Sequence, residues 1–86
     1  MYQLCIDQGN SSTKIGIFEG DVLLESLVYE VIDVEVISKL ISCYSFEGCI
    51  LSSVIEFNDE LISFLRDSFN NFVILDHNTQ IGRAHV

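Results

Sequence analysis

The stretch LCIDQGNSSTKIGIF at residues 4–18 decides the fold of this chain. Two short apolar runs flank a turn of small polar residues, and this pattern predicts two buried strands joined by a tight loop. A third strand is expected over residues 22–31, after a compact turn at residues 19–21. Because parallel neighbours need a crossover of about a dozen residues or more, these short connections predict an antiparallel meander.

The hydrophobic period then changes to that of helices. Asp33 and Asn58 are the expected N-caps of two helices, because short polar side chains can accept the first unpaired backbone N–H groups. The apolar face of the first helix would contain Ile37, Leu40, Ile41 and Tyr44. The apolar face of the second would contain Leu61, Phe64, Leu65 and Phe69. Strands are expected at residues 49–51 and 72–75.

The expected element order is therefore β-β-β-α-β-α-β. Three antiparallel strands followed by two crossovers predict an α/β fold, with a mixed five-stranded sheet and helices packed on it. This is the order of a ribonuclease-H-like lobe. The order alone does not identify the function, because that lobe occurs in nucleases, chaperones and kinases.

Composition and charge exclude several classes of partner. The chain has 86 residues and a formal net charge of −9, which fits one domain and disfavours binding to nucleic acid or to anionic lipid. Its apolar runs are far shorter than the roughly 20 residues of a membrane helix. The first residues, 1–4, contain no basic segment before an apolar stretch, so we expect no secretory signal and a cytoplasmic location.

Three cysteines fit this location. Cys5, Cys43 and Cys49 form no Cys-x-x-Cys or Cys/His group with the spacing of a metal site. An odd number of cysteines cannot all pair within one chain. We therefore expect all three to be small buried hydrophobic residues.

The loop at residues 7–14 carries the groups that a nucleotide triphosphate needs. Asp7 can hold Mg²⁺ directly or through water, Gly9 lets the backbone approach a ligand, and Lys14 supplies a positive charge. Further donors for phosphate oxygens are the backbone and side chains of Asn10, Ser11, Ser12 and Thr13. The spacing fits neither a P-loop nor a calcium EF-hand. An ordinary polar hairpin turn with a surface lysine remains the alternative.

With its surroundings, this loop resembles the type III pantothenate kinases of the acetate and sugar kinase and actin-like ATPase superfamily. The family motif Asp-x-Gly-Asn-Thr/Ser-x-x-Lys is matched by Asp7, Gly9, Asn10, Ser11 and Lys14. Two later segments also resemble the family, and they are residues 52–54 (SSV) and 75–79 (LDHNT). One departure is Glu56, where the family usually has proline. The resemblance covers residues 1–79.

The resemblance implies an enzyme that phosphorylates pantothenate with ATP in coenzyme A biosynthesis. It also implies Mg²⁺, a monovalent cation such as K⁺ or NH₄⁺, and a homodimer. Family members have two lobes, and the general base and the pantothenate contacts would follow residue 79. The chain is therefore expected to be an N-terminal lobe that is inactive alone. Two alternatives are a lobe of another sugar or acid kinase or ATPase with this fold, and a non-catalytic regulatory relative.

The last seven residues, 80–86 (QIGRAHV), do not continue the family pattern. They can be back-translated as CAGATCGGAAGAGCACACGTC, which resembles a common sequencing adapter read in frame. We therefore expect residues 1–79 to form the lobe and residues 80–86 to be a non-native tail. His77 is expected to be a loop residue without a catalytic role, and His85 falls in the tail.

Overall fold

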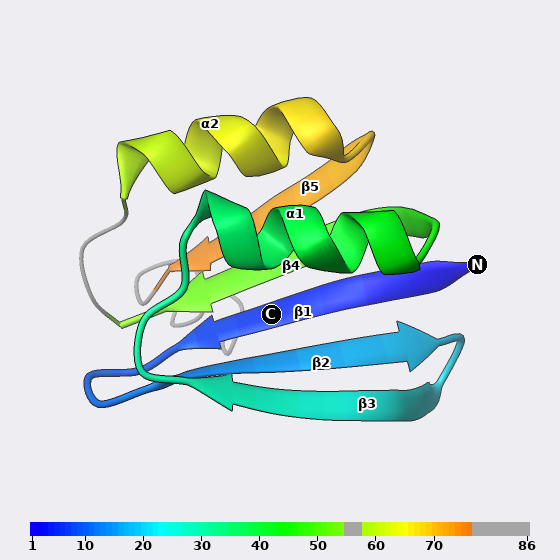
Figure 1. Cartoon of the computed structure of the whole chain (residues 1–86), viewed down its shortest axis with the longest axis horizontal. Coiled ribbons are helices and arrows are strands. Elements are labelled where there is room, and N and C mark those ends of the chain that lie inside the picture. Colours follow the sequence, from blue (N-terminus) through cyan, green and yellow to red (C-terminus); the bar gives the residue numbers. More distant parts are fainter. Residues whose placement is uncertain (55–57, 77–86) are drawn as a thin grey trace, which may run out of the picture.

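The computed structural model describes residues 1–54 and 58–76, which form a five-stranded sheet and two helices (Figure 1). The elements are β1 (Tyr2–Gln8), β2 (Thr13–Glu19), β3 (Val22–Tyr29), α1 (Val34–Cys43), β4 (Phe46–Ser53), α2 (Asp59–Ser68) and β5 (Asn71–Asp76). The strand order in the sheet is β3-β2-β1-β4-β5. β2 is antiparallel to β1 and β3, whereas β4 is parallel to β1 and β5. The predicted fold class and element order are confirmed.

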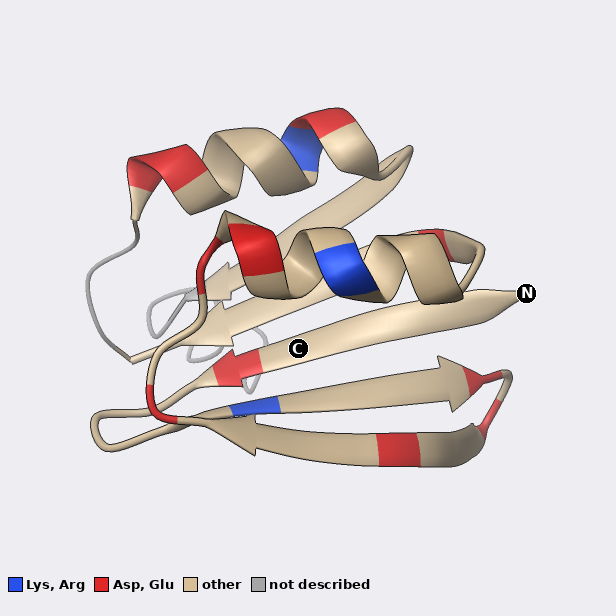
Figure 2. Ribbon diagram, in the orientation of Figure 1, with Lys and Arg blue, Asp and Glu red and all other residues tan. Residues whose placement is uncertain are grey.

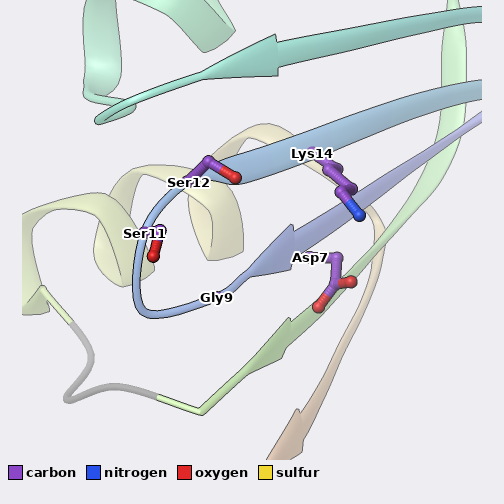
Figure 3. A pocket seen from close by; sticks show the side chains of 5 residues that line it. All are labelled: Asp7, Gly9, Ser11, Ser12 and Lys14. Carbon is purple, nitrogen blue, oxygen red and sulfur yellow. The ribbon is translucent and has the colours of Figure 1, made fainter.

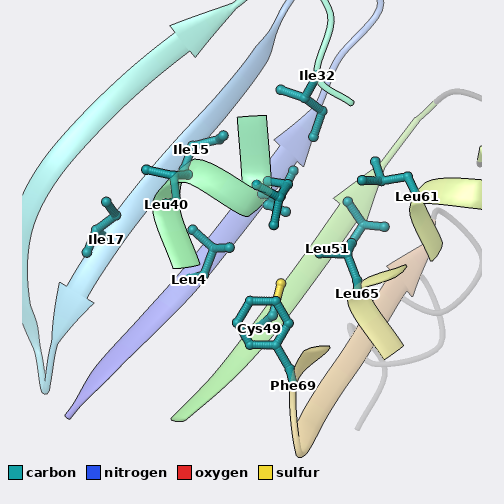
Figure 4. Packing of buried hydrophobic residues seen from close by; sticks show 12 residues of the cluster. Leu4, Ile15, Ile17, Ile32, Leu40, Cys49, Leu51, Leu61, Leu65 and Phe69 are labelled. Carbon is teal, nitrogen blue, oxygen red and sulfur yellow. The ribbon is translucent and has the colours of Figure 1, made fainter. Parts of the chain in front are cut away.

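Both helices lie on the same face of the sheet (Figure 1). Leu4 and Ile6 point from β1 toward them, because side chains two residues apart in a strand share a face. The buried core between the layers combines these strand residues with α1 and α2, as Figure 4 shows for Leu40 of α1 and Leu65 of α2. The core therefore joins one face of the sheet to both helices.

Side chains cap both helices as predicted. The carboxylate of Asp33 accepts a hydrogen bond from the Val36 N–H at 3.1 Å, and the Asn58 carbonyl oxygen accepts one from the Leu61 N–H at 3.1 Å. Such caps are each worth about 1 kcal/mol of stability. The last residues of the two predicted apolar faces, Tyr44 and Phe69, lie just past the helices as their C-caps.

Two strand boundaries differ from the prediction. β3 ends at Tyr29 instead of residue 31, because Tyr29 pairs with Thr13, where β2 begins, and no partner strand extends farther. β4 begins at Phe46 and so includes Gly48, which the sequence pattern placed before the strand. A side chain at Gly48 would lie 2.9 Å from Gln3 Oε1 and 3.0 Å from the Asn71 carbonyl oxygen. Glycine therefore allows β4 to fit between its two neighbours.

Replacing Gly48 with alanine should destabilise the sheet. The new Cβ would lie too close to the backbone of β5, so strands must shift, and overpacking of this kind costs about 1–3 kcal/mol. Urea unfolding of Gly48→Ala should show a lower midpoint, whereas the adjacent exposed Glu47→Ala should stay near the parent value. An unchanged midpoint for Gly48→Ala would show that β4 and β5 are not held this closely.

The cysteines differ in exposure, so the prediction that all three are buried is wrong for Cys43. Cys43 is exposed because it ends α1 away from the apolar stripe that contains Ile37 and Leu40. Cys5 is half-buried, and only Cys49 is buried as predicted. Burial raises the pKa of the Cys5 thiol, and it raises the pKa of Cys49 to about 12.

The rate of thiol labelling should follow the exposure of the cysteines. The thiolate is the reactive form, so exposed Cys43 should react with iodoacetamide at pH 8 in the folded chain. Cys49 should stay unmodified until the chain unfolds, because its thiol is both enclosed and protonated at that pH. Mass spectrometry of peptides labelled with and without urea measures this. Equal labelling of Cys43 and Cys49 without urea would contradict the packing of β4.

The face of the sheet opposite the helices has apolar residues that the described part of the chain leaves open. Ile50 of β4 is 39% exposed, and Val73, its partner on β5, is 44% exposed. Asp7 and Lys14 lie on this same face, near its edge, because they alternate with the buried residues of β1 and β2. Within residues 1–54 and 58–76, neither helix is long and apolar enough to span a membrane.

Candidate functional site

Asp7 and Lys14 lie directly opposite each other on the antiparallel strands β1 and β2. Their side chains therefore share one face of the sheet, and Figure 3 shows both at the same side of the turn that joins the strands. Both residues are exposed, so a ligand can reach the carboxylate and the ammonium group. The register of two strands, fixed by the core, thus brings together the acid and the base that the sequence placed seven residues apart.

The turn between them is closed by its own backbone. The Gly9 N–H donates to the Ser12 carbonyl oxygen at 2.9 Å. A Cβ at Gly9 would lie 3.3 Å from that same oxygen, so a larger residue would crowd the turn. Next to it, the Val54 N–H donates to the Gln8 carbonyl oxygen at 3.1 Å and ties the end of β1 to the residue after β4. The turn is therefore tight and anchored at its first residue.

The turn and the two charged residues form a pocket of about 130 Å³. It is lined by Asp7, Gly9, Ser11, Ser12 and Lys14 (Figure 3). Complete ligand pockets commonly measure about 300–1,000 Å³, so this pocket corresponds to one part of a ligand and leaves the rest to other groups. The two serine hydroxyls and the Lys14 ammonium group suit an anion such as a phosphate, and the Asp7 carboxylate suits a cation bound to that anion.

Charge distribution singles out Lys14. Of the basic residues in the described ranges, Lys39 lies on α1 and Arg66 on α2, so Lys14 is the basic residue of the sheet (Figure 2). Acidic residues are spread over the strands, the helices and the connections. In a chain this acidic, an anionic ligand would be attracted at the place where the lysine and the N–H groups gather.

The structure brings together most of the predicted site residues. Asn10 is exposed beside the pocket but does not line it. The Thr13 side chain is 4% exposed and points to the helix side, so only its backbone remains near the turn. Ser52 and Ser53 end β4 beside β1, and Ser52 pairs with Asp7 in the parallel register.

Other segments named from the sequence fall outside the described residues. These are Glu56, His77, the segment 78–79 and the tail 80–86. Sequence reasoning also missed one residue next to the site, Gln8, whose side chain is buried on the helix side. The sequence pattern could have shown this residue, because Gln8 is polar at a position where the alternation of Leu4 and Ile6 predicts an apolar residue.

Asp7 fits a magnesium ion that is shared with phosphate. Among the described residues, no three His, Cys, Asp or Glu side chains gather as a metal cluster. Mg²⁺ bound to a nucleotide usually keeps several waters and takes one or two carboxylates, with phosphate oxygens as the other ligands. A single exposed carboxylate beside an anion pocket meets that need, whereas it would hold a metal poorly without the phosphates.

Comparison with known proteins gives one relative in sequence and several in fold. The chain is 32% identical over 75 residues to the type III pantothenate kinase of Azobacteroides pseudotrichonymphae genomovar. CFP2. This match covers 87% of the chain and 31% of that kinase, so the chain spans about a third of the relative's length. No protein-family model matches the chain.

Two solved structures show the same fold. A ROK family protein from Streptococcus pneumoniae TIGR4, solved in complex with sucrose, superposes with a TM-score of 0.71 at 14% identity. A Bacteroides thetaiotaomicron VPI-5482 protein with an actin-like ATPase fold gives 0.59 at 16% identity. Each match covers 99% of this chain and 37% of the other. The chain is therefore similar in sequence to part of a type III pantothenate kinase, and it shares its fold with a protein of the actin-like ATPase fold.

Proposed function

We propose that this chain is the ATP-phosphate-binding lobe of an enzyme that transfers the γ-phosphate of ATP to pantothenate, a step of coenzyme A biosynthesis. The observation that carries the proposal is the pairing of Asp7 with Lys14 across β1 and β2 at a pocket lined by the Gly9–Ser12 turn. The relationship to a type III pantothenate kinase supports pantothenate as the phosphoryl acceptor. ATP as the donor is supported by that kinase and by the actin-like ATPase fold.

Each pocket residue has a proposed task. The backbone of residues 9–13, in which the Gly9 N–H closes the turn, places N–H groups of the later residues near phosphate oxygens, and Asn10 and the hydroxyls of Ser11 and Ser12 donate to the same oxygens. Lys14 offsets their negative charge, and Asp7 positions the magnesium ion on the triphosphate. When bound, Mg²⁺ neutralises charge on the phosphate oxygens. Phosphoryl transfer depends mainly on such positioning and charge stabilisation.

The remaining chemistry belongs to the part of the protein beyond this lobe. In the transfer, an oxygen of pantothenate bonds to the γ-phosphorus while the bond to the β,γ-bridging oxygen breaks and ADP leaves. The hydroxyl proton goes to a general base, which we place after residue 79 with the pantothenate contacts and the K⁺ or NH₄⁺ site. We propose residues 1–79 as the lobe, residues 80–86 as a non-native tail, and a cytoplasmic homodimer as the complete enzyme. The lobe alone should be inactive.

A coupled assay of ADP release tests this proposal in the full-length protein. ADP should form only when Mg²⁺, ATP and pantothenate are all present, and the product should be phosphopantothenate by mass spectrometry. ADP release that is independent of pantothenate would overturn the substrate assignment. Phosphopantothenate formed by purified residues 1–79 would overturn the assignment of the base to the second lobe.

The second candidate is a sugar kinase, which the sequence left open as an alternative. The fold similarity to the ROK family protein has a TM-score of 0.71, and that protein was solved with sucrose bound. At 14% identity this likeness concerns the fold alone. Replacing pantothenate with a panel of sugars in the same assay separates the two reactions. Binding of ATP without turnover of any acceptor would instead favour a non-catalytic regulatory relative.

A further inference from the structure

Gln8 is a polar side chain in a place where an apolar one would be more stable. It ends β1 and points to the helix side, as Leu4 and Ile6 do, and it is only 7% exposed. Its carbonyl oxygen, Oε1, is buried and has no hydrogen-bond partner among the described residues. A buried acceptor without a donor costs about 1–3 kcal/mol in proteins. Gln8 therefore needs an explanation other than the stability of the core.

The neighbours of Gln8 in the sheet show that its polarity is part of a pattern. Thr13 on β2 and Ser53 on β4 are its direct partners in register, and each is 4% exposed. In residues 1–54 and 58–75, the buried polar side chains are these three. They form one row across β2, β1 and β4, which we call the polar row. The buried cluster next to them is apolar.

The polar row lies directly behind the pocket. Gln8 is the residue before the Gly9–Ser12 turn, and Thr13 is the residue after it, so two members of the row hold the two ends of the turn. The third member, Ser53, precedes Val54, whose N–H bonds the Gln8 carbonyl oxygen at 3.1 Å. The next N–H along the chain, that of Gly9, closes the turn onto Ser12. The peptide group that joins Gln8 to Gly9 is thus fixed at both its carbonyl oxygen and its N–H, next to the pocket.

We propose that Gln8 is a positioning residue for the phosphate-binding turn. Its carboxamide, on the strand between Thr13 and Ser53 in the sheet register, sets the orientation of the turn from the helix side, while Asp7 and Lys14 act on the opposite side. The functional part of this inference rests on the proposed binding of ATP phosphates at the turn. It explains why an acceptor without a partner among residues 1–54 and 58–76 is retained, since local rules of stability are most often broken at functional sites.

The test compares Gln8→Met with Leu4→Met in the full-length protein. Both substitutions place methionine on the helix side of β1, and the first removes the carboxamide with little change of shape. We expect Gln8→Met to have a melting temperature at or above that of wild type. Amide hydrogen exchange at Gly9 should nevertheless be at least about tenfold faster, and the KM for ATP should rise at least about tenfold with a smaller change in kcat. Leu4→Met should change neither the exchange at Gly9 nor the KM.

Three outcomes decide the question. Wild-type exchange at Gly9 in Gln8→Met would overturn the positioning role, and so would an unchanged KM. A melting temperature lowered more than in Leu4→Met would make Gln8 a structural residue and would also overturn the proposal. If wild type does not phosphorylate pantothenate, the proposed function fails, yet the Gly9 exchange still tests the role of Gln8 because it needs no ligand.

Discussion

Asp7→Asn in the full-length protein is expected to lower kcat with pantothenate by at least about 10²-fold. Asparagine keeps the size of the side chain and can still accept one hydrogen bond, but it has no negative charge with which to hold a cation. Removing one preorganised electrostatic group from an active site commonly costs 10²–10³ in kcat. Because Asp7 is exposed at the mouth of the pocket, the folded lobe itself does not depend on its charge.

The dependence on magnesium makes this prediction specific. Asp7→Asn should need a higher Mg²⁺ concentration for half-maximal rate, while its melting temperature stays near that of wild type. The matched control is Asp21→Asn, an exposed aspartate on the β2–β3 hairpin at the other end of the sheet from the pocket. It should leave the rate and the magnesium dependence unchanged. A near wild-type rate for Asp7→Asn would remove this residue from the site.

Much of the fold could be predicted because local signals and long-range packing agree. Asp33 and Asn58 cap the helices where short polar residues precede an apolar periodicity. The short loops around β2 leave only antiparallel pairing for its two neighbours, which the structure confirms. What the pattern missed depends on partners that are distant in the sequence. Gly48 belongs to β4 because it pairs with Gln3 on β1 and Asn71 on β5, and no local rule contains those pairings.

The candidate site also combines features that the local sequence predicts with features that depend on distant partners. The pattern of residues 7–14 predicted a phosphate site, and the register of β1 and β2 places Asp7 opposite Lys14. That register follows from the turn length and from the alternation of buried residues, so it could be predicted from the sequence. The inward orientation of Thr13 follows from the same alternation, whereas the chemical motif emphasised its hydroxyl. The polar row could not be predicted, because Ser53 joins Gln8 and Thr13 only through the parallel pairing of β1 and β4.

Lys14→Ala in the full-length protein is expected to lower kcat/KM for ATP by at least about 10²-fold, chiefly through KM. Lys14 is the one basic side chain that lines the pocket, and acidic residues outnumber basic ones by 13 to four in the chain. Without the ammonium group, the phosphates would meet only hydroxyls and N–H groups in a negative field, and hydrogen bonds assisted by a charge are about twice as strong as neutral ones.

The matched control is Lys39→Ala, which removes an exposed lysine of α1 and changes the net charge by the same amount. If the overall charge governs ATP binding, Lys14→Ala and Lys39→Ala should lose equal affinity for ATP. That result would show that the assignment of Lys14 to the pocket is wrong.

The double variant of Asp7 and Lys14 tests whether the two residues act on the same ligand. Because the two side chains face each other across β1 and β2, they should act as a unit on the same triphosphate, and residues that act as a unit are strongly non-additive. The double variant should therefore lose much less than the product of the two single losses, whereas strict additivity would place Asp7 and Lys14 in separate sites.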